Sequence, residues 1–257
     1  MTSIEIANVS KRFRVSHYGT PSLFQLLRGL GQSASHKHNF EALKGVSLKI
    51  QKGDKVGLIG RNGAGKTTLM RLIHGIYKPD EGSVTVHGKV VAILQLGIGL
   101  IGILSVRDNI YFYGTILGLS GSEIRANYDN ILAISELEEF EGAEVRQLST
   151  GMRQRLAFAV ATTVRADILL LDEVLAVGDQ AFRNKCYSFL TETLAKSVTV
   201  LYASHNLASV MEYFPKTIWL DNGRVIDYGD TAEVLEKYKS KYGRPLEERQ
   251  AMSAAAV

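Results

Sequence analysis

The segment from Gly60 to Thr67 reads Gly-Arg-Asn-Gly-Ala-Gly-Lys-Thr and matches the phosphate-loop pattern G-x-x-x-x-G-K-[ST] in full. The apolar run 56–59 before it predicts a buried strand, and the apolar periodicity of residues 69–76 predicts a helix after it. Glycines in such a loop let successive backbone N–H groups point at phosphate oxygens, and the helix N-terminus adds a positive field. The sequence therefore predicts an α/β fold that binds a nucleoside triphosphate.

Each residue type in this loop has a chemical use. Lys66 is expected to neutralise the β- and γ-phosphates, and the Thr67 hydroxyl is expected to ligate Mg²⁺. The residues expected to contact the nucleotide are Gly60, Asn62, Gly63, Ala64, Gly65, Lys66, Thr67 and Thr68. A phosphate loop alone leaves many classes of nucleoside triphosphatase open.

A second motif follows about a hundred residues later, where the apolar run 168–171 ends in Asp172 and Glu173. An apolar strand that ends in two acids is the Walker B pattern. Asp172 is expected to hold the Mg²⁺ shell, and Glu173 is expected to polarise the attacking water as general base.

The composition narrows the class of protein. The 257 residues are 46% hydrophobic and 22% charged, with a net charge of +4 and no dominant Lys/Arg block, so a nucleic-acid partner is not favoured. Cys186 is the single cysteine, and the first residues contain no apolar signal core, so we expect a cytoplasmic location.

The uncharged stretch 90–106 approaches a membrane-spanning length of about 20 residues. Its glycines and Gln95 favour a buried strand that runs into an apolar loop instead.

Short sequence patterns predict where several strands, turns and helices begin and end. Alternating apolar residues near both ends of the first fifty positions predict two edge strands, separated by an insertion at 16–38. Asp221-Asn222-Gly223 predicts a hairpin turn, and Asp230 with Glu233 predicts the start of a last helix. Residues 243–257 are expected to form a flexible tail.

The motif that indicates a family is Leu148-Ser149-Thr150-Gly151-Met152, which lies about twenty residues before the Walker B strand. It resembles the LSGGQ signature of ABC transporter nucleotide-binding domains, with Thr150 and Met152 as departures. Together with the phrase Leu-Asp-Glu-Val-Leu-Ala-Val-Gly-Asp at 171–179, residues 40–240 resemble the ATPases that export O-antigen, capsule or teichoic acid.

The resemblance implies a phosphate-loop α/β fold with a mixed sheet core, an N-terminal antiparallel β subdomain and a helical subdomain that carries the signature. It places one ATPase domain at 1–242, with the helical subdomain at roughly 96–165. It also implies that ATP and Mg²⁺ are the cofactors.

The resemblance extends to individual residues around the nucleotide. Phe40 occupies the place of the aromatic ring that stacks on adenine, with Tyr18 in the insertion as a rival. Ser149 is expected to cap the following helix and offer its hydroxyl to a γ-phosphate, and Gly151 is expected to allow close backbone approach.

Three further positions match loops of the family. Gln95 matches the Q-loop glutamine, which contacts Mg²⁺ and the attacking water. Asp179 matches the D-loop that crosses between two subunits, and His205 matches the switch histidine that contacts the γ-phosphate.

The resemblance also implies partners. The phosphate loop of one subunit faces the signature of another, so a homodimer is expected. A separate transmembrane permease would dock at the loop 96–105, the polysaccharide would be handled only indirectly, and the chain would lie peripherally on the cytoplasmic face of the inner membrane. The sequence ends soon after the ATPase domain, so no C-terminal carbohydrate-binding domain is expected.

Three alternatives remain at this stage. The chain could serve another importer or a drug exporter, or it could be a catalytically inactive regulatory subunit. A soluble ABC ATPase of translation or DNA repair would carry a second ATPase domain or a long coiled coil. The 106 positions from Lys66 to Asp172 contain no heptads, and the chain has no second phosphate loop.

Overall fold

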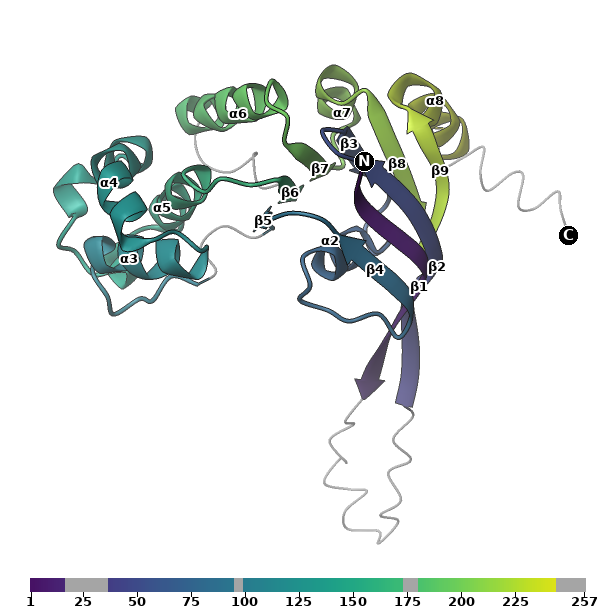
Figure 1. Cartoon of the computed structure of the whole chain (residues 1–257), viewed down its shortest axis with the longest axis horizontal. Helices are drawn as coiled ribbons and strands as arrows, with labels where there is room; N and C mark the ends of the chain where they lie inside the picture. The colour runs from purple at the N-terminus through teal and green to yellow at the C-terminus, as the bar shows by residue number, and fades with distance from the viewer. Residues whose placement is uncertain (17–36, 95–98, 173–179, 244–257) are drawn as a thin grey trace, which may run out of the picture.

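The fold contains a six-stranded sheet, a three-stranded sheet and a group of helices to one side (Figure 1). The computed structural model describes residues 1–16, 37–94, 99–172 and 180–243. No helix within these ranges is both long enough and apolar enough to cross a membrane. Residues 90–93 of the uncharged stretch form a strand, as expected.

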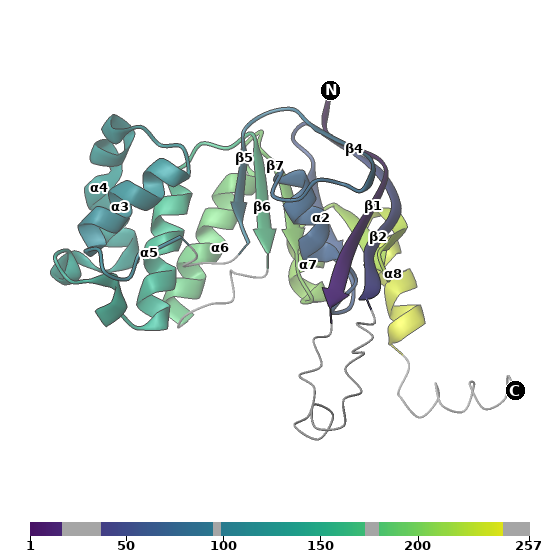
Figure 2. The ribbon, with the colours of Figure 1, turned by 90° about the horizontal axis from the view of Figure 1, so that it is seen from below.

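The six-stranded sheet has the order β5-β6-β7-β3-β8-β9, and all neighbours are parallel except β8 and β9. Figure 2 shows β5, β6 and β7 side by side. The strands are β3 (Lys55–Ile59), β5 (Val90–Ile93), β6 (Ile168–Asp172), β7 (Thr199–Ala203), β8 (Lys216–Asp221) and β9 (Arg224–Asp230). Continuous apolar runs form the central strands because both faces of this sheet are covered.

The two faces of this sheet bury separate clusters. Leu169 and Leu171 of β6 belong to one cluster, which also takes in residues of α5 (Thr150–Thr162), α6 (Gln180–Leu194), α7 (Leu207–Tyr213) and α8 (Thr231–Tyr242). Ile168 and Leu170 face α2 (Lys66–Ile73) and the three-stranded sheet. This alternation follows from the two-residue period of a strand, and it fixes α2 and its phosphate loop against one face.

The three-stranded antiparallel sheet has the order β2-β1-β4, formed by β1 (Thr2–Ser16), β2 (Lys37–Gln51) and β4 (Glu81–Val86). The expectation of two edge strands is correct for β2 and wrong for β1, which is the central strand. β4 covers the second edge of β1, with Ile6 opposite Val84. That pairing joins segments almost eighty residues apart, which the alternation within β1 cannot reveal.

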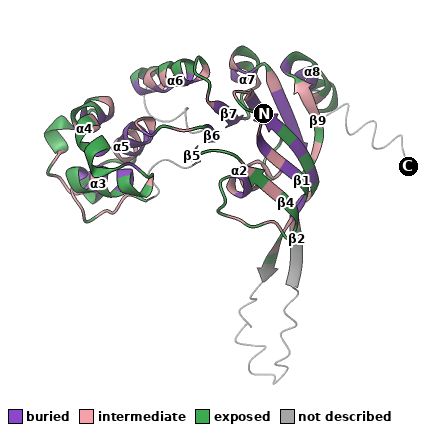
Figure 3. Ribbon diagram, viewed as in Figure 1, coloured by how far each residue is buried: buried purple, intermediate pink, exposed green. Residues whose placement is uncertain are grey.

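The helices between β5 and β6 form a group of their own. They are α3 (Val106–Ile116), α4 (Gly121–Ser135), the short 3₁₀ helices Glu138–Phe140 and Val145–Gln147, and α5. α3, α4 and α5 pack on one another, apart from the three-stranded sheet (Figures 1 and 2). Exposed residues dominate the surfaces of α3 and α4 (Figure 3). These helices fall inside the range expected for the helical subdomain, whose boundaries stay a prediction.

Candidate functional site

The phosphate loop connects the end of β3 to the start of α2, as the sequence predicts. Gly60 opens the loop with φ at +153°, and a Cβ atom there would lie 2.1 Å from the carbonyl oxygen of Leu220. Only glycine allows the loop to pass this close to β8. The loop is therefore fixed at its first residue against the neighbouring strand.

The Lys66 ammonium group crosses this loop. Its Nζ donates to the carbonyl oxygen of Gly60 at 2.6 Å and to that of Arg61 at 3.2 Å. The Arg61 carbonyl also accepts from the N–H of Ala64 at 3.1 Å. A positive charge is thus held over a curled backbone at a helix N-terminus, an arrangement that suits an anion.

Two oxygen ligands lie together beside the loop. The Thr67 hydroxyl, in the first turn of α2, donates to Oδ2 of Asp172 at the end of β6 over 3.2 Å. Hydroxyl and carboxylate oxygens are ligands that Mg²⁺ accepts. No group of three or more His, Cys, Asp or Glu side chains in the described ranges could hold a metal by itself. The pair thus supplies two oxygen atoms of the kind that such a cation binds.

These residues line a cavity of about 340 Å³. Its walls are Phe40, Ala42, Asn62, Gly63, Ala64, Gly65, Lys66, Thr67, Thr68 and Asp172. Phe40 is 53% exposed at this cavity, so its ring is available to a ligand. Ala42 was not anticipated, although it lies two residues from Phe40 on β2, and that spacing places both on one face. Tyr18 lies outside the described residues.

His205 lies at the same edge of the sheet but not in the cavity wall. β6 and β7 are parallel, and Asp172 is opposite Ala203, the last residue of β7. His205 follows two residues later and is exposed, after Ser204 donates its N–H to the Leu58 carbonyl at 3.2 Å. The carboxyl ends of the parallel strands thus place His205 at the same edge of the sheet as the phosphate loop.

The signature residues lie elsewhere, at the start of α5. Ser149 caps this helix as expected, because its hydroxyl accepts from the N–H of Met152 at 3.2 Å. Neither Ser149 nor Gly151 lines the cavity of its own chain. Gln95, Glu173 and Asp179 lie outside the described residues.

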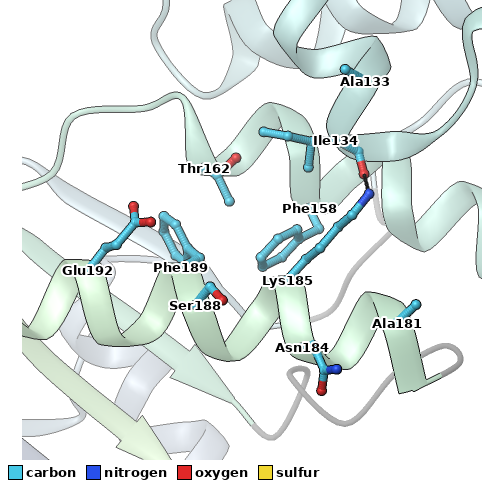
Figure 4. A pocket seen from close by; sticks show the side chains of 10 residues that line it. All are labelled: Ala133, Ile134, Phe158, Thr162, Ala181, Asn184, Lys185, Ser188, Phe189 and Glu192. Atoms are coloured by element: carbon cyan, nitrogen blue, oxygen red, sulfur yellow. Dashed lines mark hydrogen bonds between the residues drawn. The ribbon is translucent and has the colours of Figure 1, made fainter.

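A larger cavity of about 530 Å³ lies between α4, α5 and α6 (Figure 4). Phe158 and Phe189 supply apolar walls, and Lys185 donates to the Ile134 carbonyl at 3.4 Å and to the Glu136 carboxylate at 2.7 Å. None of the predicted site residues lines it. Size alone does not identify a site, and the phosphate loop marks the smaller cavity as the functional one.

Known proteins are similar to this chain in sequence and in fold. A family model described as ABC transporter matches residues 43–176. The O-antigen export system ATP-binding protein RfbB of Klebsiella pneumoniae is 39% identical over 246 residues, which cover 92% of this chain and 97% of that protein. The RfbB protein of Myxococcus xanthus is 42% identical over 93% of this chain and 56% of its own length.

Solved structures agree on the fold. The dimeric post-hydrolysis structure of the ATP-binding cassette MJ0796 bound to ADP and Pi matches with a TM-score of 0.70 and 24% identity, over 89% of this chain and 98% of that one. An ATP-binding subunit of an ABC transporter matches with a TM-score of 0.72 and 22% identity, over 97% and 98%. These matches confirm the expected α/β fold with its antiparallel subdomain and helical group. The chain therefore belongs to the ABC transporter family and is one of its ATPases.

Proposed function

We propose that this chain is the ATP-hydrolysing subunit of an exporter that moves a cell-surface polysaccharide across the cytoplasmic membrane. The observation that carries the proposal is similarity to the RfbB protein of Klebsiella pneumoniae over nearly the full length of both chains. O-antigen, capsule and teichoic acid are the substrate classes to test. Another importer or exporter is the competing function, and no feature of the described structure favours it.

ATP would occupy the cavity around the phosphate loop. The exposed ring of Phe40 would stack on adenine, since stacking recognises the shape of a base with few hydrogen bonds. Lys66 would exchange the carbonyl oxygens of Gly60 and Arg61 for phosphate oxygens. Thr67 and Asp172 would hold Mg²⁺, which supplies charge neutralisation for the phosphates.

Hydrolysis would then need a water molecule activated beside the γ-phosphate. Glu173 would take a proton from that water while the water oxygen forms a bond to the γ-phosphorus. The bond between the γ-phosphorus and the bridging oxygen would break, and ADP would leave with that oxygen. Gln95 would orient the water and contact Mg²⁺. His205, at the carboxyl edge of the sheet, would donate to the γ-phosphate.

A second copy of the chain would complete each site. Ser149 caps α5 and still has its own hydroxyl proton to donate, yet it lies outside the cavity of its own chain. In a head-to-tail homodimer, Ser149 and Gly151 would face the γ-phosphate bound to the other subunit. Asp179 would lie at the crossing between subunits, so two ATP molecules would be buried in one interface.

A transmembrane permease would dock on the helical group from the cytoplasmic side. Ile103 in the loop 96–105 is 69% exposed, which favours a partner surface over core packing for this loop. Phe112 and Ile116 of α3 are also exposed, and their spacing of four residues places them on one face of the helix. These apolar side chains support a peripheral location at the inner membrane.

The decisive test replaces Glu173 by glutamine in the full chain, with Glu192→Gln in the larger cavity as a matched control. We expect Glu173→Gln to abolish ATP turnover while ATP-dependent dimerisation persists, and the control to hydrolyse ATP normally. Unchanged turnover in Glu173→Gln would disprove the general-base assignment. The export proposal itself is tested with the co-expressed permease in inverted vesicles, where ATP should drive uptake of a lipid-linked polysaccharide. If ATP drives transport of a different solute and no polysaccharide enters the vesicles, the chain serves another importer or exporter instead.

A further inference from the structure

The last turn of α8 contacts the phosphate loop. The guanidinium of Arg61, the second residue of the loop, lies over the ring of Tyr242, with its carbon 5.5 Å from the ring centroid. Tyr242 is the final residue of α8 and lies 181 positions further along the chain. A cation over an aromatic face at this distance is attracted to the ring electrons, so the loop and the helix end are physically linked.

Tyr242 has a second attachment. Its hydroxyl donates to Oδ2 of Asp221 at 2.7 Å, and the Lys241 ammonium lies 3.0 Å from the same oxygen. Burial alone would raise the pKa of Asp221, but the hydrogen bonds from Tyr242 and Lys241 outweigh it and the pKa is lowered. Asp221 therefore stays charged and keeps the tyrosine hydroxyl oriented towards the hairpin turn.

That hairpin turn holds the other side of the loop. The N–H of Gly223 donates to the carbonyl of Ala64 at 3.0 Å, and the Gly223 carbonyl accepts from Lys44 at 2.8 Å. The loop is thus held at its second residue through the Arg61 side chain and at its fifth through the Ala64 backbone. Arg61 contacts Tyr242, whose hydroxyl bonds Asp221. Ala64 bonds Gly223, which lies two residues after Asp221. Between them lie Asn62 and Gly63, which are exposed and line the cavity.

These contacts become important when Lys66 changes partners. Its ammonium now bonds the carbonyls of Gly60 and Arg61, and it cannot make these bonds and neutralise phosphate equally well. The Arg61–Tyr242 contact uses the Arg61 side chain and neither carbonyl, so that exchange does not require the contact to break. We propose that Tyr242 is a positioning residue, which acts through Arg61 and Asp221 to hold the phosphate loop in its ATP-binding shape. This inference rests on the proposed binding of ATP at the loop.

The test measures the Kd for MgATP and the KM and kcat of hydrolysis on the full chain. Tyr242→Leu removes the ring, and we expect ATP affinity to fall by about two- to five-fold, the effect of one exposed cation–π contact. The loss should appear in KM rather than in kcat. Tyr242→Phe keeps the ring under Arg61 and should restore most of the affinity.

Arg61→Gln provides the same test from the exposed side of the contact, and it applies even if Tyr242→Leu fails to fold, since the Tyr242 ring also packs on Trp219 and Tyr238. Combining Arg61→Gln with Tyr242→Leu in a double variant should weaken ATP binding no further than the more severe single substitution does, because both remove the same contact. Tyr77→Leu is the matched control, because Arg71 lies over Tyr77 at 5.7 Å near the far end of α2. It should leave the ATP affinity unchanged.

Wild-type affinity in Arg61→Gln, or independent, multiplying losses in the double variant, would overturn the inference alone. A wild-type chain that binds no ATP would instead contradict the proposed function, and with it this inference. A loss in Tyr77→Leu equal to that in Tyr242→Leu would show general destabilisation and also overturn the positioning role.

Discussion

Replacing Gly60 and Gly63 by alanine, one at a time, separates the folding role of the phosphate loop from its binding role. Both glycines have positive φ, at +153° and +78°. A Cβ atom at Gly60 would meet the Leu220 carbonyl oxygen at 2.1 Å, whereas one at Gly63 would have no atom within 4 Å. The first substitution therefore collides with β8, and the second enters open space at a residue that lines the cavity.

The two substitutions should lower the free energy of unfolding by different amounts. For Gly60→Ala, a backbone conformation reserved for glycine costs of order 1–3 kcal/mol, and the forced shift of β8 adds about 1–3 kcal/mol. The sum of about 2–6 kcal/mol is a large part of a typical stability of about 5–15 kcal/mol. For Gly63→Ala, the left-handed conformation costs roughly 1–2 kcal/mol and no collision is added.

Urea unfolding and ATP titration of both variants check this reasoning. With equal backbone costs at the two positions, Gly60→Ala should lose about 1–3 kcal/mol more unfolding free energy than Gly63→Ala, which is the collision cost alone. Gly63→Ala should remain folded but bind ATP more weakly, because its methyl group occupies the space left for phosphate. Equal losses of stability in the two variants would refute the argument from the Leu220 contact.

Two further predictions concern residues outside the loop. Ser149→Ala removes the cap of α5 and should lower the free energy of unfolding by about 1 kcal/mol in a denaturant titration. Ser188→Ala, at an exposed position inside α6, is the control and should change the stability little. Asp221 has a lowered folded pKa, so its contribution is present above the unfolded value near 3.8 and is lost as the pH falls through the folded value. Asp221→Asn should therefore be less stable than wild type at pH 7, and a gap that stayed constant down to pH about 2 would contradict this assignment.

Local signals were sufficient for much of the fold. The strand, loop and helix around Gly60, the hairpin at Asn222 and the cap at Asp230 are all as predicted, because each depends on neighbouring residues. Asn222 and Gly223 both have positive φ, which the tight two-residue turn requires. Ala42 could also have been found, from its spacing to Phe40 on one face of a strand.

Contacts between distant segments were not predictable in this way. The central place of β1 depends on β4, and the contact of Arg61 with Tyr242 joins residues 181 positions apart. Neither leaves a periodic or spacing signal in the sequence. The roles of Gln95, Glu173 and Asp179 rest on the family resemblance and stay predictions.

The position of β3 in its sheet has a consequence for synthesis on the ribosome. β3 pairs with β7 on one side and β8 on the other, so both of its partners lie about 140 residues or more further along the chain. At about 5–20 residues per second, roughly 7–28 seconds pass between the appearance of β3 and that of β7, its first neighbour. During that interval the phosphate loop has no sheet to support it. The nascent chain should therefore acquire its ATP site only after β7 and β8 have emerged, and the phosphate loop should not bind nucleotide before then.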